Sequence, residues 1–412
     1  MRLQATLSVF LFIGIFTIIG CSKNDDISVI PSLTSNTGTT NNATDPYSAI
    51  KTAFGIAIDP TNLENYANQI KPVYIVKTNV AANSITDKTA TLGRVLFYDK
   101  NLSIDNTISC ASCHKQNFAF GDTAVVSEGV EGGLTIRHSM RLINTRFANE
   151  AKFFWNERAA NLMTQTSMPI QDHLEMGFSG TGGRGNINTL TSKLSTINYY
   201  KELFKFTFGD TVVTENRIQT SLASFINSIQ SFDSKYDIGR AQVNNDNQPF
   251  PNFTAQENQG KNLFITPPVL NAAGLRTTGG FGCNACHNAP EFDIDPNTLN
   301  NGIIGIANSS TGIDITNSRA SSLRDITNAA GVVNTPMMHT GVLRSLRAVI
   351  NHYNTINLNP RNTNLDPRLR PGGNGQNLNA TEAEIAAVAA FMQTLGGTNV
   401  YVNKKWSNPF LN

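Results

Sequence analysis

Apolar residues recur with the period of an α-helix in two segments of the chain. The first segment follows Thr214, whose hydroxyl can cap a helix, and the second follows Thr381 and Glu384, which have the spacing of a capping box. We expect the second helix to stop at Gly396 and Gly397. The apolar positions are Ile218, Leu222, Phe225, Ile226 and Ile229 in the first helix, and Ile385, Val388, Phe391, Met392 and Leu395 in the second.

A third helix is expected after Ser345, which can cap its first turn. On this helix Tyr353 points inward with the apolar residues, whereas its neighbour His352 points away. The positions that share the apolar face are Leu346, Val349, Ile350 and Tyr353.

Long alternating strand patterns are absent, and residues 243–252 and 354–380 are rich in Asn, Pro and Gly. We therefore expect a mainly α-helical fold with long irregular loops. Residues 92–97 and 259–264 both contain the pattern Gly-x-x-Leu-Phe, and both precede a pair of cysteines. This internal echo predicts two related domains, residues 47–245 and 246–412.

Composition narrows the class of protein but does not identify it. The chain has 412 residues, of which 40% are hydrophobic and 15% charged, and its net charge is +2. Such a chain can bury a sizeable core, and no basic stripe predicts a nucleic-acid partner.

The N-terminus predicts export. The apolar run of residues 7–19 is too short for a confident membrane span and has the length of a signal peptide's apolar region. Cys21 sits where a lipoprotein is cleaved and lipidated, which predicts a signal peptide over residues 1–20 and a lipid-anchored tether over residues 21–46; an uncleaved anchor is the alternative. We expect a periplasmic or cell-surface lipoprotein, held by its lipid on the outer membrane.

The other four cysteines form two pairs, each with the spacing Cys-x-x-Cys and each followed at once by His. Two thiols at this spacing can add to the two vinyl groups of one haem, while the next residue offers its imidazole to the iron. The alternatives are a thioredoxin-type redox motif, one zinc site made from both pairs, and accidental spacing. A thioredoxin motif rarely occurs twice without its βαβ frame, and a zinc site would not need both flanking histidines. The haem-attachment residues are therefore Cys110, Cys113 and His114, and Cys283, Cys286 and His287.

The sixth ligand of each iron decides between an electron-transfer haem and a reactive one. For the second haem the candidates are Tyr353 and its rivals Met337, Met338 and His339. Tyr353 could equally be a core residue whose hydroxyl is hydrogen-bonded.

Polar candidates for the first site lie between residues 155 and 177. Asn156 is expected to cap a helix that Pro169 ends, so that Trp155 and Gln165 lie about 80° apart around it and face one site. Glu175 follows in a loop.

These residues resemble the bacterial di-haem cytochrome c peroxidase family, including the MauG-like enzymes that mature methylamine dehydrogenase. The resemblance covers roughly residues 50–400. The positions that carry it are 92–97, 102–103, 108–114, 118–120, Phe154, Trp155, Arg158, Gln165, Pro169, 175–177, 323–325, Pro336, Met338, His339, Gly341 and 346–353.

The resemblance implies two cytochrome c-like domains with one haem in each. It assigns the peroxide-reactive haem to His114, with Glu175 and Gln165 in its distal pocket. Trp155 would relay electrons between the haems, and the haem on His287 would store or deliver an electron.

The chain departs from the peroxidase branch at three points. Tyr353 stands where that branch has a Met ligand, as in the MauG-like branch. Residues 127–136 contain no His to block the first haem, which should then be open at rest. His138 replaces an Asn that commonly contributes to a calcium site, and this change counts against calcium.

These observations leave three alternative functions. The leading one is reduction of hydrogen peroxide to water with electrons from a small donor protein such as a cytochrome. The second is MauG-like oxidation of a protein or organic substrate through high-valent iron. The third is a non-catalytic surface electron carrier, against which Glu175 and Gln165 count.

Overall fold

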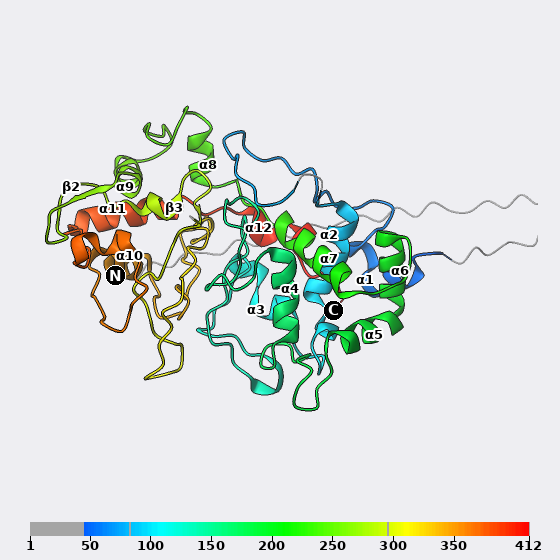
Figure 1. Cartoon of the computed structure of the whole chain (residues 1–412). Helices are drawn as coiled ribbons and strands as arrows, with labels where there is room; N and C mark the ends of the chain where they lie inside the picture. Colours follow the sequence, from blue (N-terminus) through cyan, green and yellow to red (C-terminus); the bar gives the residue numbers. More distant parts are fainter. Residues whose placement is uncertain (1–44, 82–83, 295, 412) are drawn as a thin grey trace, which may run out of the picture. The chain divides into compact units, whose positions relative to one another are not determined.

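Helices form most of the regular structure in this computed structural model, which describes residues 45–81, 84–294 and 296–411 (Figure 1). The predicted signal peptide, Cys21 and most of the tether lie outside these residues. Within the described ranges, no helix is both long and apolar enough to cross a membrane. The mainly α-helical class is confirmed, since the strands are short and form two separate two-stranded sheets.

The first eight helices lie between Ser48 and Arg240. They are α1 (Ser48–Phe54), α2 (Asp87–Tyr98), α3 (Cys110–Cys113), α4 (Leu162–Gln171), α5 (Ile187–Thr196), α6 (Asn198–Phe208), α7 (Glu215–Ser228) and α8 (Lys235–Arg240). The later helices are α9 (Ala255–Ile265), α10 (Leu346–Asn354), α11 (Glu382–Gln393) and α12 (Asn399–Val402). The antiparallel strands are β1 (Pro268–Leu270) with β2 (Arg276–Gly279), and β3 (His287–Asn288) with β4 (Asp293–Ile294).

The repeated Gly pattern has the same structural cause in both places. A Cβ atom on Gly93 of α2 would lie 1.9 Å from the carbonyl oxygen of Ser221 on α7. A Cβ atom on Gly260 of α9 would lie 1.8 Å from the carbonyl oxygen of Ala387 on α11. Each glycine therefore lets two helix backbones approach closely. The Cβ atom of any other residue would prevent this approach.

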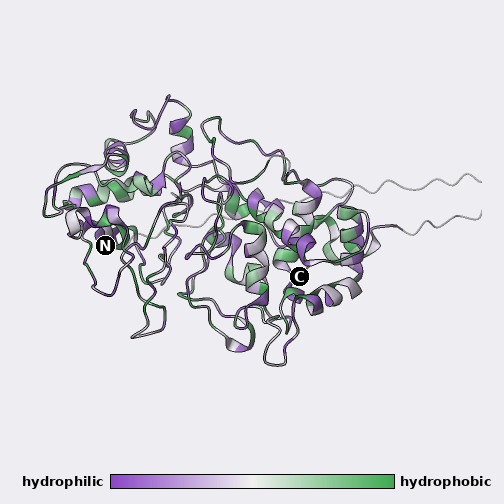
Figure 2. Ribbon diagram, viewed as in Figure 1, coloured by the Kyte–Doolittle hydropathy of each residue, from purple (hydrophilic) through white to green (hydrophobic). Residues whose placement is uncertain are grey.

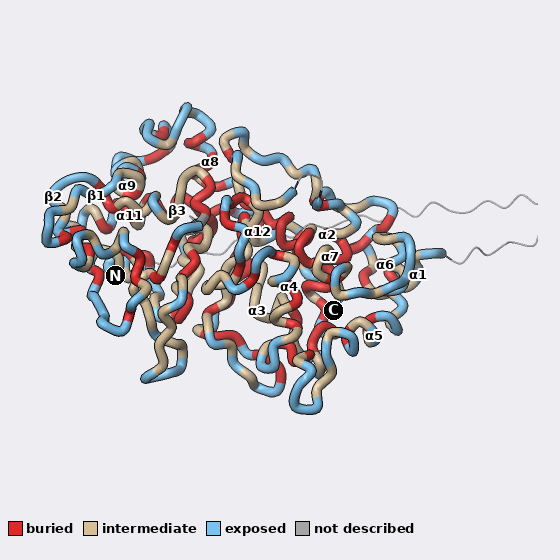
Figure 3. Tube along the Cα trace, in the orientation of Figure 1, coloured by how far each residue is buried: buried red, intermediate tan, exposed pale blue. Residues whose placement is uncertain are grey.

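Each of these helix pairs belongs to its own apolar core. The first core draws on α1, α2 and α4 to α7, and the second on α9, α10 and α11. Figure 3 shows the buried stretches along α2, α7 and α11, and Figure 2 shows the hydrophobic residues gathered on the same helices. The amphipathic pattern predicts one buried face for each helix, but residues 90–97 of α2 and 221–228 of α7 are buried on every side, so these two helices cross inside the first core.

The last residues of the chain pack in the first core, not the second. Trp406 is fully buried there, and its indole nitrogen lies 3.3 Å from Ser228 Oγ. Tyr98 on α2 donates a hydrogen bond to the Trp406 carbonyl at 2.6 Å, and Tyr66 donates one to the Lys405 carbonyl at 2.7 Å. The described chain from Asp45 onward forms one compact unit by its contacts. The division near residue 245 stays a prediction.

The predicted caps of three helices are confirmed. The hydroxyl of Thr214 accepts from Arg217 at the start of α7, and that of Ser345 accepts from Ala348 at the start of α10. Thr381 forms a capping box with Glu384 at the start of α11, which ends at Gln393 just before the two glycines. These ends follow local hydrogen bonding, which is why the sequence predicts them.

The helix predicted to start at Asn156 is wrong in its bounds. Asn161 is the cap instead, its side-chain oxygen accepting from the Thr164 amide at 2.9 Å, and α4 runs through Pro169. Trp155 therefore precedes the helix. Phe154 and Glu157 adopt positive φ angles of 68° and 58°, which no helix allows.

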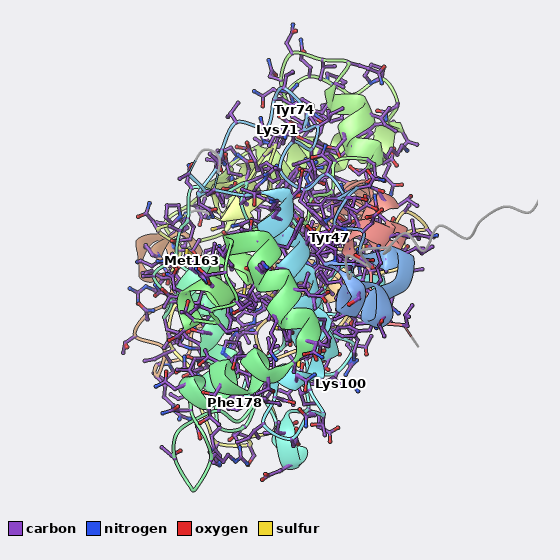
Figure 4. The ribbon with its side chains drawn as sticks, turned by 90° about the vertical axis from the view of Figure 1, so that its right-hand side faces the viewer. Tyr47, Lys71, Tyr74, Lys100, Met163 and Phe178 are labelled. Atoms are coloured by element: carbon purple, nitrogen blue, oxygen red, sulfur yellow. The ribbon has the colours of Figure 1, made fainter. Side chains whose placement is uncertain are left out.

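The segment before α2 is held by side chains from distant helices. Tyr74 donates a hydrogen bond to the carboxylate of Asp237 on α8 at 3.0 Å. Figure 4 labels Tyr74 beside Lys71 on this segment. This hydrogen bond joins the segment before α2 to helix α8.

Candidate functional site

The first cysteine pair lies on α3, a single turn that holds both thiols on one side of the chain. Ser112 Oγ accepts a hydrogen bond from the Ser109 amide at 3.0 Å and fixes the start of this turn. His114 follows directly, and its Nδ1 lies 3.0 Å from the Phe120 carbonyl oxygen. A carbonyl can only accept, so Nδ1 carries the proton and Nε2 keeps a lone pair for a metal.

Cys283 begins a 3₁₀ turn, Cys283–Ala285, and Cys286 caps the end of this turn. The side-chain oxygen of Asn284 accepts from the Ala289 amide at 2.8 Å and braces the following chain. His287 begins β3. Burial lowers the pKa of His287 to about 4, and burial also lowers the pKa of His114, so both imidazoles are neutral and able to bind a metal.

The thiols do not have the character of a redox pair. Burial raises the pKa of Cys110 to about 12, that of Cys113 to about 11 and that of Cys283 to about 12. A thioredoxin-type motif needs a lowered thiol pKa, because the thiolate is the reactive form.

The two pairs also line different cavities, so they do not combine into one zinc site. No group of three or more acidic, His or Cys side chains in the described ranges is placed to hold a metal ion.

Each Cys-x-x-Cys-His motif lines a cavity of its own. The N-terminal cavity, of about 160 Å³, contains the side chains of the first motif, and the C-terminal cavity, of about 490 Å³, contains those of the second. The walls are mostly apolar. The N-terminal cavity is also lined by Gln165, Glu175 and Trp155, and the C-terminal cavity by Trp155, Met337, Met338 and Tyr353.

Glu175 is half-buried and held by the backbone of its loop. Its amide donates to Asp172 Oδ1 at 3.1 Å, and its carbonyl accepts from the Val130 amide at 3.0 Å. The neighbouring segment packs closely, since a Cβ atom on Gly129 would lie 1.9 Å from the Leu174 carbonyl oxygen. Burial, with the charge of Asp172, raises the pKa of Glu175 to about 7 against the opposing charge of Arg158. Glu175 can therefore both accept and return a proton near neutral pH.

Trp155 lies in the wall that the two cavities share. Its indole N–H donates to the His138 carbonyl oxygen at 2.6 Å, and its ring meets that of His339 edge-on at 6.2 Å. The His138 amide in turn donates to the His339 carbonyl at 2.7 Å. Backbone groups from two distant segments thus fix the indole, although Trp155 is not on the predicted helix.

Tyr353 faces the C-terminal cavity from α10, as predicted. Its hydroxyl accepts a long hydrogen bond of 3.4 Å from Asn301 Nδ2, and burial raises its pKa above the usual value. His352 does not line the cavity and lies 2.9 Å from the Asn301 carbonyl through Nε2. The tyrosine is therefore a neutral phenol in this environment.

The rival ligands divide into two groups. Met337 and Met338 line the C-terminal cavity, and the sulfur of Met338 lies 3.6 Å from Asn301 Nδ2. His339 is buried but does not line that cavity.

The sequence analysis missed the polar residues of the shared wall. Arg141 and Arg319 line both cavities, and Asn301 lies between Tyr353 and Met338. All three stand in irregular segments, where no periodicity indicates which way a side chain points.

Residues 87–245 match the family model described as di-haem cytochrome c peroxidase. The methylamine utilization protein MauG of Methylophilus methylotrophus is 27% identical over 322 residues, or 77% of this chain and 84% of the relative. The cytochrome c551 peroxidase of Nitrosomonas europaea is 30% identical over 202 residues, or 49% of this chain and 52% of the relative. The chain is thus similar to the di-haem cytochrome c peroxidase and MauG-like family.

Two solved structures share the fold of this chain. A MauG-like protein associated with microbial copper homeostasis superposes with a TM-score of 0.62 at 24% identity, covering 83% of this chain and 99% of that one. The Y463M variant of the dihaem peroxidase BthA from Burkholderia thailandensis gives 0.57 at 19% identity, covering 84% and 90%.

The relatives named cytochrome c peroxidases indicate an oxidoreductase of the peroxidase type, and the matching family description implies haem cofactors. The residues present fit two haems. Each cavity is mostly apolar and brings together two thiols and a neutral imidazole. On the shared wall, the buried Nε atoms of Arg141 and Arg319 have no hydrogen-bond partner among the residues that the structure describes.

Proposed function

We propose that this protein is a di-haem c-type peroxidase that reduces hydrogen peroxide to two water molecules with two protons and two electrons from an external donor. Peroxide reacts in the N-terminal cavity, and the C-terminal haem passes electrons toward it. Each haem would be attached through its two cysteines and held by its histidine. A bound haem supplies the iron at which peroxide binds and the redox change that the side chains lack.

The observation that carries this proposal is the position and pKa of Glu175. Its carboxylate faces the same cavity as Cys110, Cys113 and His114, and burial raises its pKa to about 7. Cleaving the O–O bond requires a proton to move from one peroxide oxygen to the other, which then leaves as water. A carboxylate with a pKa near neutrality suits both transfers.

Gln165 and Trp155 have different parts in this proposal. Gln165 projects from α4 into the N-terminal cavity, where its amide can orient peroxide by hydrogen bonding. Trp155 lies in the wall of both cavities and offers an aromatic path for electrons between them.

The donor and location follow from the same proposal. Cytochrome c peroxidases in the family carry the donor in their names, and we propose a small cytochrome as the donor here. We also propose export, with the lipid anchor at Cys21 that the sequence predicts.

The test is the rate of peroxide reduction by Glu175→Gln. The amide cannot accept a proton, so we expect the rate to fall about 10²-fold or more. In the unmutated protein kcat/KM should rise as pH increases through about 7, because the ionised carboxylate accepts the first proton. The pH profile of the variant should lack this rise.

The exposed Glu382→Gln is the matched control and should keep the unmutated rate and pH profile. An unchanged rate in Glu175→Gln would remove this residue from the mechanism. A rate that falls while the pH limb persists would assign the limb to another group.

One observation favours MauG-like oxidation of a protein or organic substrate as the second candidate. Tyr353, not a methionine, projects into the C-terminal cavity from α10, and the MauG relatives align over most of the chain. Oxidation of a substrate other than the donor, with peroxide consumed in equal amount, would favour this function.

A further inference from the structure

Two buried arginines line the wall between the cavities without any acidic partner. Arg319 is 5% exposed and Arg141 is partly buried, and each lines both cavities. In the described part of the chain, neither forms an ion pair within 4.0 Å, and the Nε atom of each is buried without a hydrogen-bond partner. A buried charge without a partner is costly, and native structures usually pair it.

The contacts of Arg319 hold it in place without satisfying its charge. Its backbone amide donates to the Trp155 carbonyl at 2.8 Å, and its guanidinium carbon lies 4.5 Å from the centre of the Phe153 ring. Glu150, Glu157 and Asp293 act on it only from a distance. The guanidinium is therefore positioned by packing, and its hydrogen-bonding edge is left for a ligand.

The hydrogen-bonding capacity of the Arg141 side chain is used only in part. One terminal nitrogen donates to the Ser322 carbonyl at 3.1 Å, and that oxygen is neutral. Burial lowers the pKa of both guanidiniums, that of Arg319 to about 10. Arginine side chains stay protonated in proteins at neutral pH. The shared wall therefore presents two cations to any anion that enters from either side.

We propose that Arg141 and Arg319 bind the propionate carboxylates of the two haems, and that Arg319 serves both haems at once. Each haem carries two propionates on one edge, and planar guanidinium groups match carboxylates in geometry and charge. This arrangement would turn the propionate edges of both haems toward the wall that contains Trp155. It rests on haem being present in both cavities, which is part of the proposed function.

Other arginines near the cavities provide matched comparisons. Arg158 lines only the N-terminal cavity, where it lies over the Phe154 ring at 3.5 Å. Arg347 is exposed and pairs with Glu382. Neither can serve both haems.

The experiment measures the midpoint potentials of both haems in a spectroelectrochemical titration of the full-length protein. In Arg319→Gln both potentials should fall, because the lost cation no longer stabilises the more negative reduced state of either haem. Arg319→Lys should restore part of each shift. Arg158→Gln should lower the N-terminal potential alone, and Arg347→Gln should change neither.

Several outcomes would overturn the proposal. Unchanged potentials in Arg319→Gln with full haem content would show that the cation faces no propionate, and a shift in one haem alone would disprove the shared role. If Arg319→Gln loses haem, retention of haem by Arg319→Lys supports the proposal, whereas equal loss in both variants contradicts a role for the charge.

Two measurements on the unmutated protein complete the test. Inorganic phosphate should leave both potentials unchanged, since the propionates already occupy the arginines; a phosphate-dependent shift would mean an exchangeable anion site and overturn the proposal. A pyridine haemochrome assay that finds no haem would defeat the proposed function as well. A peroxide-inactive protein with both potentials sensitive to Arg319 would defeat only the peroxidase function.

Discussion

At the scale of the residue, Tyr353 is the candidate sixth ligand whose role decides how the C-terminal haem behaves. Its phenol faces the cavity that also contains His287 and Met338. A phenolate ligand would stabilise ferric iron, whereas a thioether would favour ferrous iron. Both candidate ligands hydrogen-bond to the same amide nitrogen, that of Asn301, so their roles are separable only by substitution.

We expect Tyr353→Phe to change the electronic and paramagnetic resonance spectrum of the C-terminal haem alone, because only that cavity contains the phenol. The comparison is Met338→Leu, which removes the rival sulfur. If Tyr353 is the ligand, the leucine variant should keep the unmutated spectrum; the opposite pattern would make Met338 the ligand and Tyr353 a wall residue.

The sequence indicates some of these residues and not others, for a physical reason. Thiol spacing is local, so both Cys-x-x-Cys-His motifs are readable directly. The position of Trp155 depends on the positive φ angles of Phe154 and Glu157, which periodicity does not reveal. Arg319 lies in an irregular segment and matters only through its tertiary neighbours, so nothing in its local sequence indicates its position.

At the scale of the element, the two glycine crossings are the most demanding contacts. The α2–α7 and α9–α11 pairs each join helices that are far apart in the sequence. Amphipathic periodicity predicted α7 and α11 and their caps, but it does not say which helix packs on which. The recurring Gly was the available signal, and the structure explains it as the point of closest approach.

We expect Gly260→Ala to lower the free energy of unfolding by about 1–3 kcal/mol, because the added methyl group forces α9 away from the Ala387 carbonyl. A higher helix propensity offsets only part of this loss. Urea unfolding measures it, and Ser192→Ala on the exposed face of α5 is a control that should stay within about 0.5 kcal/mol. A Gly260→Ala protein as stable as the control would mean that the helices separate freely.

At the scale of the whole molecule, the C-terminal segment ties the end of the chain to the first core. Arg94 on α2 donates to the Ser407 carbonyl at 2.7 Å, and Gln116 donates to the Val400 and Asn403 carbonyls at 3.0 Å. Gln116 follows the first Cys-x-x-Cys-His motif by two residues, so the C-terminal segment binds next to the first motif although it follows the second in the sequence.

Trp406→Ala should therefore destabilise the protein by about 3 kcal/mol or more, because the indole is fully buried in the first core. The measurement is the shift of the urea unfolding midpoint, followed by the near-ultraviolet signal of the first core's aromatic residues. Val402→Ala, on the exposed side of α12, should leave the midpoint unchanged. An unchanged unfolding midpoint in Trp406→Ala would mean that the C-terminal segment only lies on the surface of the first core.

This return of the chain has a consequence for biogenesis. The first core contains the residues around Cys110, but Val400 and Trp406 complete it. We therefore expect the first core to reach its full packing only after the last residues have been synthesised. Before that point the first cysteine pair belongs to an incompletely packed core, which would ease the covalent attachment of a cofactor.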